Sequence, residues 1–323
     1  MTAKIVPHYD SNRNTLSDVV PLDVPYSVQI EPSQYCNLSC NYCVQSFDKQ
    51  SNKKQLMTMG IFSEIINQIK EFEKKLKVFN FSGWGSPLVN PLLPDMICLL
   101  KSANVTDNIA VITNGLLLGP HLSMSLVDAG VDHIRISLQG MTGKKYKEIS
   151  GKYIDFEEFV DNIQFLYKNK KQCKVSIKIA NIALDEFDEE LFYNTFGPIT
   201  DQMYVESIRP MFAENKQDGR RISKYGIEHP LVVVCPQPWF MLSVTATGDI
   251  LPCCSYYDPA KFGNIKDTSL RMLWESKEMK EFQIMLLEGR KDNPVCRTCH
   301  MPDAVLTPGD ELDDRADEIR GRL

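Results

Sequence analysis

Hydrophobic and polar positions alternate along this chain in two rhythms, one typical of strands and one typical of helices. Six short runs rich in Val, Ile and Phe predict strands at residues 27–31, 77–82, 108–113, 133–138, 174–180 and 203–206. Apolar residues at helical spacing predict helices between them, at residues 58–72, 92–101, 123–129, 156–167 and 186–193, with Thr58 as an N-cap. Strands that alternate with helices predict an α/β fold, here a partial (β/α)6 barrel of the TIM type with parallel strands.

The pattern changes after residue 213. The polar run 214–226 predicts a linker, which we extend to residue 230. Beyond it, Thr247-Gly248-Asp249 between two apolar runs predicts a hairpin, and residues 270–287 have the period of an amphipathic helix. We therefore expect an N-terminal leader on the surface (1–22), the barrel (23–213), the linker (214–230), a small α+β domain (231–303) and a charged tail that is frayed or a surface helix (304–323).

Composition excludes several classes of protein. The 323 residues are 43% hydrophobic and 24% charged, as in an ordinary globular protein. The net charge of −6, without a dense basic block, argues against a nucleic-acid partner. Residues 1–10 lack the apolar core of a signal peptide, and no apolar run approaches the ~18 residues of a membrane span. Ten cysteines in such a chain predict metal ligation in a reducing cytoplasm, with no membrane association.

Three of these cysteines, Cys36, Cys40 and Cys43, form a CxxxCxxC motif directly after the first predicted strand. Pro32 ends that strand, so the cysteines begin a loop at the end where barrel enzymes place their active sites. Three thiolates can hold three irons of a [4Fe-4S] cube and leave the fourth iron open to a small molecule. The alternatives are a zinc knuckle or three unrelated thiols; zinc sites usually add a second cysteine pair nearby, and the next cysteine is Cys98.

This spacing resembles that of the radical S-adenosylmethionine (SAM) superfamily, and the resemblance extends over roughly residues 24–210. The segment 81–87 resembles the family's glycine-rich turn after the second strand. The resemblance implies that Gly83, Trp84, Gly85 and Ser86 contact the ammonium group of SAM. Ser86 stands where the family usually has an acid, so we expect weaker SAM binding rather than its loss.

Two further strand ends, at residues 113–115 and 137–140, resemble family segments that contact the ribose and carboxylate of SAM. The SAM contacts implied here are Tyr42, Thr113, Asn114, Gly115, Ser137 and Gln139. Gln139 replaces a frequent Asp, and Tyr42 corresponds to an aromatic residue near the adenine. Each segment alone would indicate only a turn between a strand and a helix. Their order at successive strand ends favours the SAM site.

A second set of cysteines lies in the C-terminal region: Cys235, Cys253, Cys254, Cys296 and Cys299. The spacing Cys-x12-Gly-x4-Cys, followed by a distant CxxC, resembles the SPASM/twitch extension of radical SAM enzymes. The resemblance implies an auxiliary [4Fe-4S] cluster, and its ligands are expected to be Cys235, Cys253, Cys296 and Cys299. Cys254 is the alternative to Cys253, and a structural zinc in the same cage is the alternative to the cluster.

The resemblance implies a radical SAM enzyme. Its reduced cluster would cleave SAM to a 5′-deoxyadenosyl radical that abstracts hydrogen from a substrate carbon, with the auxiliary cluster assisting. Oxidation and epimerisation of a sugar or cyclitol both stay open, and in epimerisation Cys254 would return the hydrogen. The implied partners are a small molecule, with carbohydrate favoured, and an electron donor such as flavodoxin or ferredoxin. Modification of a precursor peptide is an alternative, and an electron-transfer protein without SAM turnover is the alternative from another class.

Three other residues receive structural interpretations. Cys98 lies in an apolar helical stretch and is expected in the core. Cys173 is interpreted as incidental, and His133 at the start of a strand is interpreted as structural rather than as a ligand.

Overall fold

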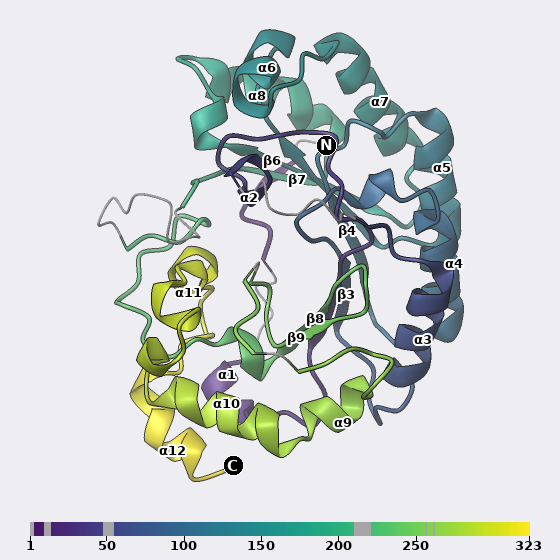
Figure 1. Ribbon diagram of the computed structural model, residues 1–323. Coiled ribbons are helices and arrows are strands. Elements are labelled where there is room, and N and C mark those ends of the chain that lie inside the picture. Colours follow the sequence, from purple (N-terminus) through teal and green to yellow (C-terminus); the bar gives the residue numbers. More distant parts are fainter. Residues whose placement is uncertain (1–2, 10–13, 48–54, 210–220, 256, 261) are drawn as a thin grey trace.

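The computed structural model describes residues 3–9, 14–47, 55–209, 221–255, 257–260 and 262–323. Six neighbouring parallel strands form the centre of a curved sheet that leaves one side of the barrel open (Figure 1). They are β2 (Ser27–Ile30), β3 (Val78–Phe81), β4 (Ile109–Thr113), β5 (His133–Leu138), β6 (Lys174–Ala180) and β7 (Gln202–Glu206). Each lies within a predicted strand or extends it by one residue, which confirms the predicted α/β partial barrel.

Helices cover the outer face of this sheet (Figure 1). The predicted ones are α3 (Met59–Ile69), α4 (Leu93–Ala103), α5 (Pro120–Ala129), α7 (Phe156–Asn169) and α8 (Asp188–Phe196). The Thr58 side chain accepts the N–H of Ile61 at 3.3 Å, which confirms the predicted cap. Among the described residues before the linker, three short helices were not predicted: α1 (Leu16–Val19), α2 (Val44–Phe47) and α6 (Gly143–Ser150). The described helices include no segment with the length and hydropathy of a membrane span.

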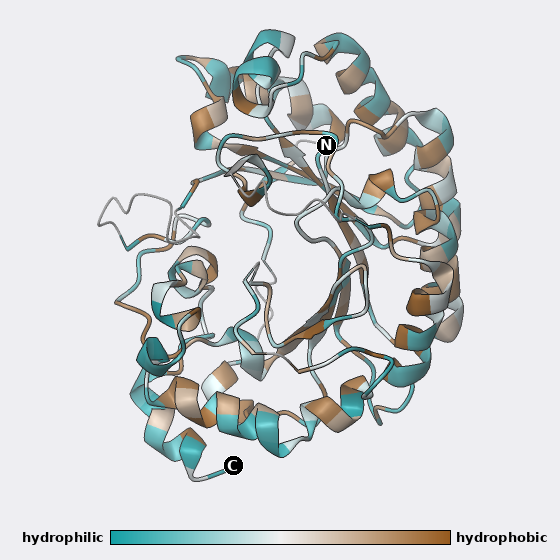
Figure 2. Ribbon diagram, viewed as in Figure 1, coloured by the Kyte–Doolittle hydropathy of each residue, from teal (hydrophilic) through white to brown (hydrophobic). Residues whose placement is uncertain are grey.

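The two faces of the sheet differ sharply in polarity. Side chains alternate between the faces of a strand, and the outward positions, such as Val28, Phe79 and Ile134, are apolar and fully buried under the helices. Figure 2 shows the strands as predominantly hydrophobic and the helices as mixed. The register places polar residues together on the inner face: Ser27, Gln29, Asn80, Arg135, Ser176, Lys178, Tyr204 and Glu206. The barrel interior therefore carries many polar side chains beside apolar ones such as Val78 and Met241.

The sheet continues beyond the barrel strands in both directions. β8 (Met241–Val244) pairs in parallel with β2, and β9 (Ile250–Leu251) pairs antiparallel with β8, which confirms the predicted hairpin. Gly248 in its turn has φ +90°, a conformation that favours glycine. At the other edge, β1 (Lys4–Ile5) pairs in parallel with β7. The described strands thus form one sheet in the order β1-β7-β6-β5-β4-β3-β2-β8-β9.

The N-terminal segment differs from the expected surface leader. Besides β1, it contributes Leu16 and Val20, which are 2% and 1% exposed and pack with Trp239 and Ile319. The edge of β7 offers unpaired backbone groups, and β1 satisfies them. The described part of residues 1–22 is therefore integral to the fold.

The C-terminal region also departs from expectation in two places. The helix predicted at 270–287 is two helices, α9 (Leu270–Trp274) and α10 (Lys277–Leu287), because Ser276 accepts the N–H of Met279 at 3.0 Å and begins a new helix. The tail is packed rather than frayed: Leu312 is 1% exposed, and α12 (Ala316–Arg320) buries Ile319. Helix α11 (Met301–Val305) precedes it. Single 3-10 turns lie at Pro87–Val89, Asn181–Ala183, Gly197–Ile199, Gln237–Trp239, Arg290–Asp292, Cys296–Thr298 and Asp313–Arg315.

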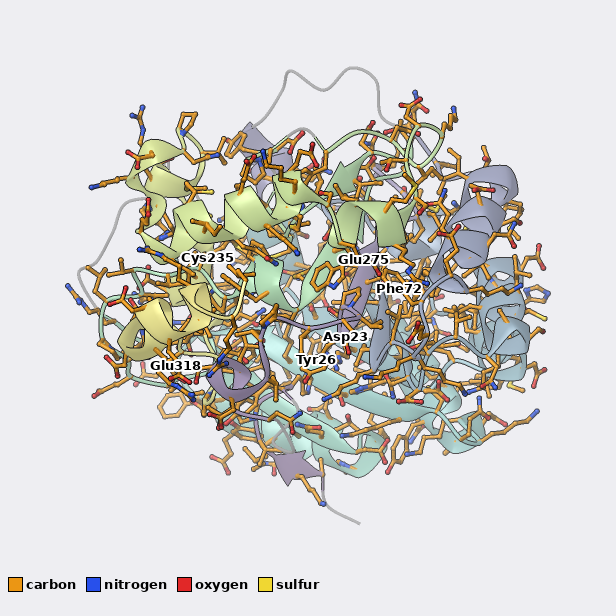
Figure 3. All side chains as sticks on the ribbon, turned by 90° about the horizontal axis from the view of Figure 1, so that it is seen from below. Asp23, Tyr26, Phe72, Cys235, Glu275 and Glu318 are labelled. Atoms are coloured by element: carbon orange, nitrogen blue, oxygen red, sulfur yellow. The ribbon has the colours of Figure 1, made fainter. Side chains whose placement is uncertain are left out.

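Contacts from α3 fasten the C-terminal region to the barrel. The carboxamide of Gln68 donates to the carbonyl of Ile265 at 2.7 Å and accepts the N–H of Leu270 at 3.1 Å. In Figure 3, Asp23, Phe72 and Glu275 lie close together where the N-terminal segment, the end of α3 and α9 meet. Residues 214–220 of the predicted linker lie outside the described residues, and Ile222 and Glu228 pair in an antiparallel bridge.

Candidate active site

The CxxxCxxC loop lies at the C-terminal end of β2, as expected, and is held by α6 and by the end of β4. The N–H groups of Ser39 and Asn41 donate to carbonyls at the end of α6, at 3.0 and 2.9 Å. The Asn114 carboxamide donates to Asn37 Oδ1 at 2.8 Å and lies 3.9 Å from Cys36 Sγ. Burial, followed by the neighbouring thiols of Cys43 and Cys36, raises the pKa of Cys40 to about 12. A cation bound among these thiols would favour their ionisation.

Zinc was the alternative metal for both cysteine sets. Among the described residues, no group of three His, Cys, Asp or Glu side chains is placed to hold a single metal ion in this structure. Thiolates around one Zn²⁺ each lie about 2.3 Å from it, whereas a cube of four irons holds its thiolates at separate corners.

The glycine-rich turn after β3 is seated directly on the start of the cysteine loop. A Cβ at Gly85 would meet the carbonyl oxygen of Ser33 at 1.9 Å, so only glycine fits. The N–H of Ser86 donates to the carbonyl of Tyr35 at 2.8 Å. Ser86 is 3% exposed, and its hydroxyl has no hydrogen-bond partner among the described residues. A buried hydroxyl without a partner suits an ammonium donor such as that of SAM.

Glu31, which sequence reasoning missed, supports this turn. Its carboxylate accepts the N–H of Trp84 at 3.1 Å, and the residue is 8% exposed. Burial raises the pKa of Glu31, with the hydrogen bond from Trp84 acting in the opposite direction. The available signal was an acidic residue at an inward strand position immediately before Pro32.

The other expected SAM contacts divide into two groups. Tyr42 donates its hydroxyl hydrogen to the Gln139 carboxamide, and Gln139 donates to the carbonyl of Ser137 at 3.3 Å, so the structure brings these three together. Burial raises the pKa of Tyr42 well above its usual value, so its hydroxyl stays protonated. Thr113 instead lies on the outward side of β4, and its hydroxyl accepts the N–H of Gly115 at 3.1 Å. Thr113 and Gly115, whose φ is +76°, shape the turn that presents Asn114.

The second cysteine set converges on one small pocket in the C-terminal region. The pocket is lined by all five thiols, Cys235, Cys253, Cys254, Cys296 and Cys299, together with residues of α10. Burial raises the pKa of Cys235 strongly and that of Cys296 to about 12. Arg290 acts in the opposite direction on both, because a nearby cation favours thiolates.

Arg290 joins the two halves of this pocket. Its guanidinium donates to the carbonyls of Val232 at 2.8 Å and Cys299 at 2.6 Å, with longer bonds to those of Val233 and Cys296. It therefore fixes the CxxC turn against the segment that leads into Cys235. Asn293 supports the same turn by accepting the N–H of Cys296 at 3.0 Å.

Cys253 and Cys254 occupy different positions. Cys254 borders both the five-thiol pocket and the barrel cavity, whereas Cys253 borders the five-thiol pocket and, together with Cys254, a small cleft beside Gly83 and Trp84. The Cys254 thiol lies 3.6 Å from the carboxamide oxygen of Gln237, and burial raises its pKa to about 11. The barrel cavity has a volume of about 430 Å³ and extends from the β3 turn to Cys254 along the polar inner face of the sheet.

Comparison with known proteins decides the family. Residues 30–191, half of the chain, match the model of the radical SAM superfamily, and residues 235–300 match that of the SPASM iron–sulfur cluster-binding domain. The chain belongs to the radical SAM superfamily. It is a radical SAM enzyme with a SPASM domain, and its cofactors are SAM and two [4Fe-4S] clusters.

Curated relatives of this radical SAM enzyme have diverse names. A probable GTP 3′,8-cyclase of Methanococcus vannielii is 32% identical over 169 residues, covering 52% of this chain and 54% of the relative. The chain spans about a third to a half of the length of the GTP 3′,8-cyclases it matches. The PqqA peptide cyclase of Gluconobacter oxydans is 24% identical over 306 residues, covering 85% of this chain and 82% of the relative.

Solved structures share the fold. BtrN in complex with AdoMet and 2-DOIA has a TM-score of 0.57 at 18% identity, covering 85% of this radical SAM enzyme and 93% of BtrN. Streptococcus suis SuiB bound to precursor peptide SuiA has a TM-score of 0.62 at 15% identity, covering 89% and 72% of the two chains.

The two cysteine sets predict separable clusters. Anaerobically reconstituted protein should contain about eight irons and eight sulfides per chain. A variant with Cys36, Cys40 and Cys43 all changed to Ala should retain about half of each, because the five-thiol pocket does not depend on that loop. Iron and sulfide analysis measures this, and loss of all iron from the variant, or zinc in the native protein, would contradict the assignment.

The hydrogen bonds of Arg290 predict that this residue stabilises the auxiliary cluster site. In the triple-alanine variant, the iron content measures the second site alone. Adding Arg290→Met to this variant should lower the iron content at least about twofold, because the substitution releases the four carbonyl groups that Arg290 binds. Arg297→Met, at an exposed position in the same turn, is the matched control and should retain its iron. Equal iron in the two variants would show that Arg290 does not hold the pocket together.

The close packing of Gly85 against Ser33 predicts that SAM binding depends on this contact between the turn and the cysteine loop. Gly85→Ala forces the turn away from Ser33 and should weaken SAM binding at least about tenfold, measured by equilibrium dialysis with reconstituted protein. Gly60→Ala is the control: its new methyl would lie 3.8 Å from the nearest atom in the first turn of α3, so SAM binding should not change. Unchanged SAM binding in Gly85→Ala would contradict the proposed dependence of SAM binding on this packing contact.

Proposed function

We propose that this radical SAM enzyme acts at a carbon atom of a small molecule held in the barrel cavity, and that Cys254 returns a hydrogen atom to that carbon. The reaction would then be an epimerisation. The observation that carries the proposal is the position of Cys254, which lines the barrel cavity together with the β3 turn residues Gly83 and Trp84.

The cofactors are assigned to the sites described above. Cys36, Cys40 and Cys43 would hold the cluster that binds SAM, with SAM contacts from the turn 83–86. A second group, Tyr42, Asn114, Ser137 and Gln139, would complete the SAM site. Cys235, Cys253, Cys296 and Cys299 would hold the auxiliary cluster. When bound, SAM and the reduced cluster supply the hydrogen-abstracting chemistry. The buried hydroxyl of Ser86 supports the SAM assignment, since it would accept from the ammonium group.

The thiol of Cys254 suits hydrogen return. The S–H bond is weak enough to break as a C–H bond forms on a carbon radical, so the hydrogen moves with its electron and leaves a sulfur radical. One electron from a low-potential protein reductant and one proton from solvent then restore the thiol. Burial raises the pKa of Cys254, which favours the protonated form that can donate hydrogen.

The size of the cavity supports a small substrate. Its volume of about 430 Å³ is near the lower end of the range for ligand pockets, which suits a sugar or cyclitol. Peptide modification is the alternative suggested by likeness to the PqqA peptide cyclase over 85% of the chain.

Oxidation is the second candidate for the reaction. It is favoured by the shared border of the two cavities at Cys254, because a substrate in the barrel would lie close to the pocket proposed for the auxiliary cluster. In oxidation the substrate radical would pass one electron to the auxiliary cluster and release its hydroxyl proton to solvent, leaving a carbonyl group, and no hydrogen would return from Cys254.

Deuterium labelling tests the role of Cys254 without the native substrate. Reconstituted enzyme incubated anaerobically with SAM and dithionite in D₂O should release 5′-deoxyadenosine that carries one deuterium. Among the exchangeable hydrogens, a thiol bound to the cavity wall is the one that a carbon radical can remove most easily. Mass spectrometry measures the label.

The matched pair of variants is Cys254→Ala and Cys98→Ala, since Cys98 is exposed on α4. Cys98→Ala should retain the deuterium label, and Cys254→Ala should cleave SAM but lose it. Unlabelled 5′-deoxyadenosine from the native enzyme would remove the donor role and favour oxidation. The absence of any 5′-deoxyadenosine would contradict radical SAM catalysis by this chain.

A further inference from the structure

Three uncharged polar side chains form a row across the inner face of β3, β2 and β8. The register pairs Gln29 of β2 with Asn80 of β3 on one side and with Ser243 of β8 on the other. Residues paired in this way lie on the same face of a sheet, on strands about 4.8 Å apart. Their chain neighbours, such as Val28 and Ile30, are buried on the outer face. We call Asn80, Gln29 and Ser243 the polar row.

Two members of the polar row carry buried polar atoms that lack a partner. The hydroxyl oxygen of Ser243 and the carboxamide oxygen of Asn80 are buried and form no hydrogen bond within the part of the chain that the structure describes. Ser243 as a whole is 5% exposed. A buried polar group without a hydrogen bond destabilises the folded state, so its presence needs a reason, and a ligand is one such reason.

The polar row borders the space in which the proposed function places the substrate. Asn80 and Gln29 line the barrel cavity. Gln29 and Ser243 line the small cleft that Cys254 also borders. Because Gln29 belongs to both spaces, a molecule that contacts the row from the cavity lies beside Cys254.

Apolar side chains adjoin the polar row on the same face of the sheet. Val78 and Met241 stand two residues before Asn80 and Ser243 on β3 and β8, and both line the barrel cavity. A saturated ring that carries several hydroxyl groups has polar edges and apolar C–H groups on its faces. The row and the apolar pair together offer a surface to each of these parts.

We propose that the polar row binds hydroxyl groups of a sugar or cyclitol ring, and that Cys254 returns hydrogen to a ring carbon that carries a hydroxyl. This inference rests on the proposed function, which places the substrate in the barrel cavity. A carboxamide and a serine hydroxyl can each donate and accept, and so can a ring hydroxyl. An ionised carboxylate only accepts and an ammonium group only donates, so either would leave part of the row unused.

Binding of hydroxylated rings to the enzyme tests the polar row. Reconstituted native enzyme is titrated, with SAM present and without reductant, with myo-inositol, D-glucose or cyclohexanol, and saturation-transfer NMR measures the dissociation constant. We expect myo-inositol or D-glucose to bind. Cyclohexanol, a ring with a single hydroxyl, should bind at least about tenfold more weakly. Failure of both polyhydroxylated rings to bind the native enzyme would overturn the proposal.

Three variants remove the polar atoms of the row and largely conserve side-chain shape: Gln29→Met, Asn80→Leu and Ser243→Ala. Each should weaken binding of the polyhydroxylated ring at least about threefold, because hydrogen bonds to the ring are lost. Asn67→Leu, at an exposed position of α3, is the matched control and should bind the ring as the native enzyme does. Equal binding by all of these proteins would overturn the row. Weaker SAM binding by Ser243→Ala in equilibrium dialysis would assign the row to the cofactor and would also overturn it.

The stability of the same variants separates a binding row from a structural one. Asn80→Leu and Ser243→Ala each remove a buried polar atom without a partner, so the Tm measured without ring compounds should equal or exceed that of the native protein. Ring binding would then fall without a fall in stability, which a loss of packing does not produce. A lower Tm for Ser243→Ala, the smaller change, would show that this hydroxyl is satisfied by water or a neighbour in the folded protein and would overturn the proposal.

The deuterium experiment on Cys254 is independent of the polar row, because it uses no substrate. A deuterium label from the native enzyme together with no ring binding would overturn the row and leave the proposed function intact. Ring binding that depends on the row, without a deuterium label, would support the row and remove the hydrogen return by Cys254.

Discussion

The parallel pairing of β2 with β8 is the constraint on which the rest of this molecule depends. β2 carries the CxxxCxxC loop at its C-terminal end, β3 on one side carries the glycine-rich turn, and the β8–β9 hairpin on the other leads into Cys253 and Cys254. Backbone hydrogen bonds between adjacent strands fix their register. One strand therefore sets the distance between the CxxxCxxC loop and the second group of thiols, and the Gln68 contacts from α3 reinforce that placement.

The sheet combines this placement with a division of polarity between its faces. The outer face buries Val, Ile and Phe under helices and supplies the apolar burial that stabilises the fold. The inner face exposes Gln29, Asn80 and Arg135 to a cavity instead of filling it with aliphatic layers. Such a barrel gives up part of its core for a cavity lined by both polar and apolar side chains. The N-terminal segment and the C-terminal tail help to enclose that space, because Leu16 and Asp310 both line it.

Much of the barrel was predictable because its signals are local. Strand periodicity, the Thr58 cap and the hairpin at Gly248 each involve a few neighbouring residues, and spacing alone grouped the two sets of cysteines. Several errors concern contacts that no local pattern encodes, although the break between α9 and α10 at Ser276 and the exposure of Cys98 had local signals. β1 is two residues long and exists because β7 offers an edge. Cys98 was expected in the core but is exposed, since the buried stripe of α4 passes through Leu93, Met96, Ile97 and Leu100. The row of Asn80, Gln29 and Ser243 depends on sheet register and on a strand far along the chain. The only local signal for this grouping was the polar residues that alternate with apolar ones in strands whose sequences otherwise indicate burial.

The position of β8 beside β2 has a consequence for biosynthesis. Ribosomes release β2 long before residues 241–244, so the nascent barrel carries β2 as an open edge while most of the chain is still being made. An unpaired edge with an apolar outer face invites pairing with other chains. The thiols of the first loop are likewise present before the second set is complete. Assembly of this protein therefore has a built-in interval in which a half-made sheet must be protected, and that interval closes only when the C-terminal hairpin docks.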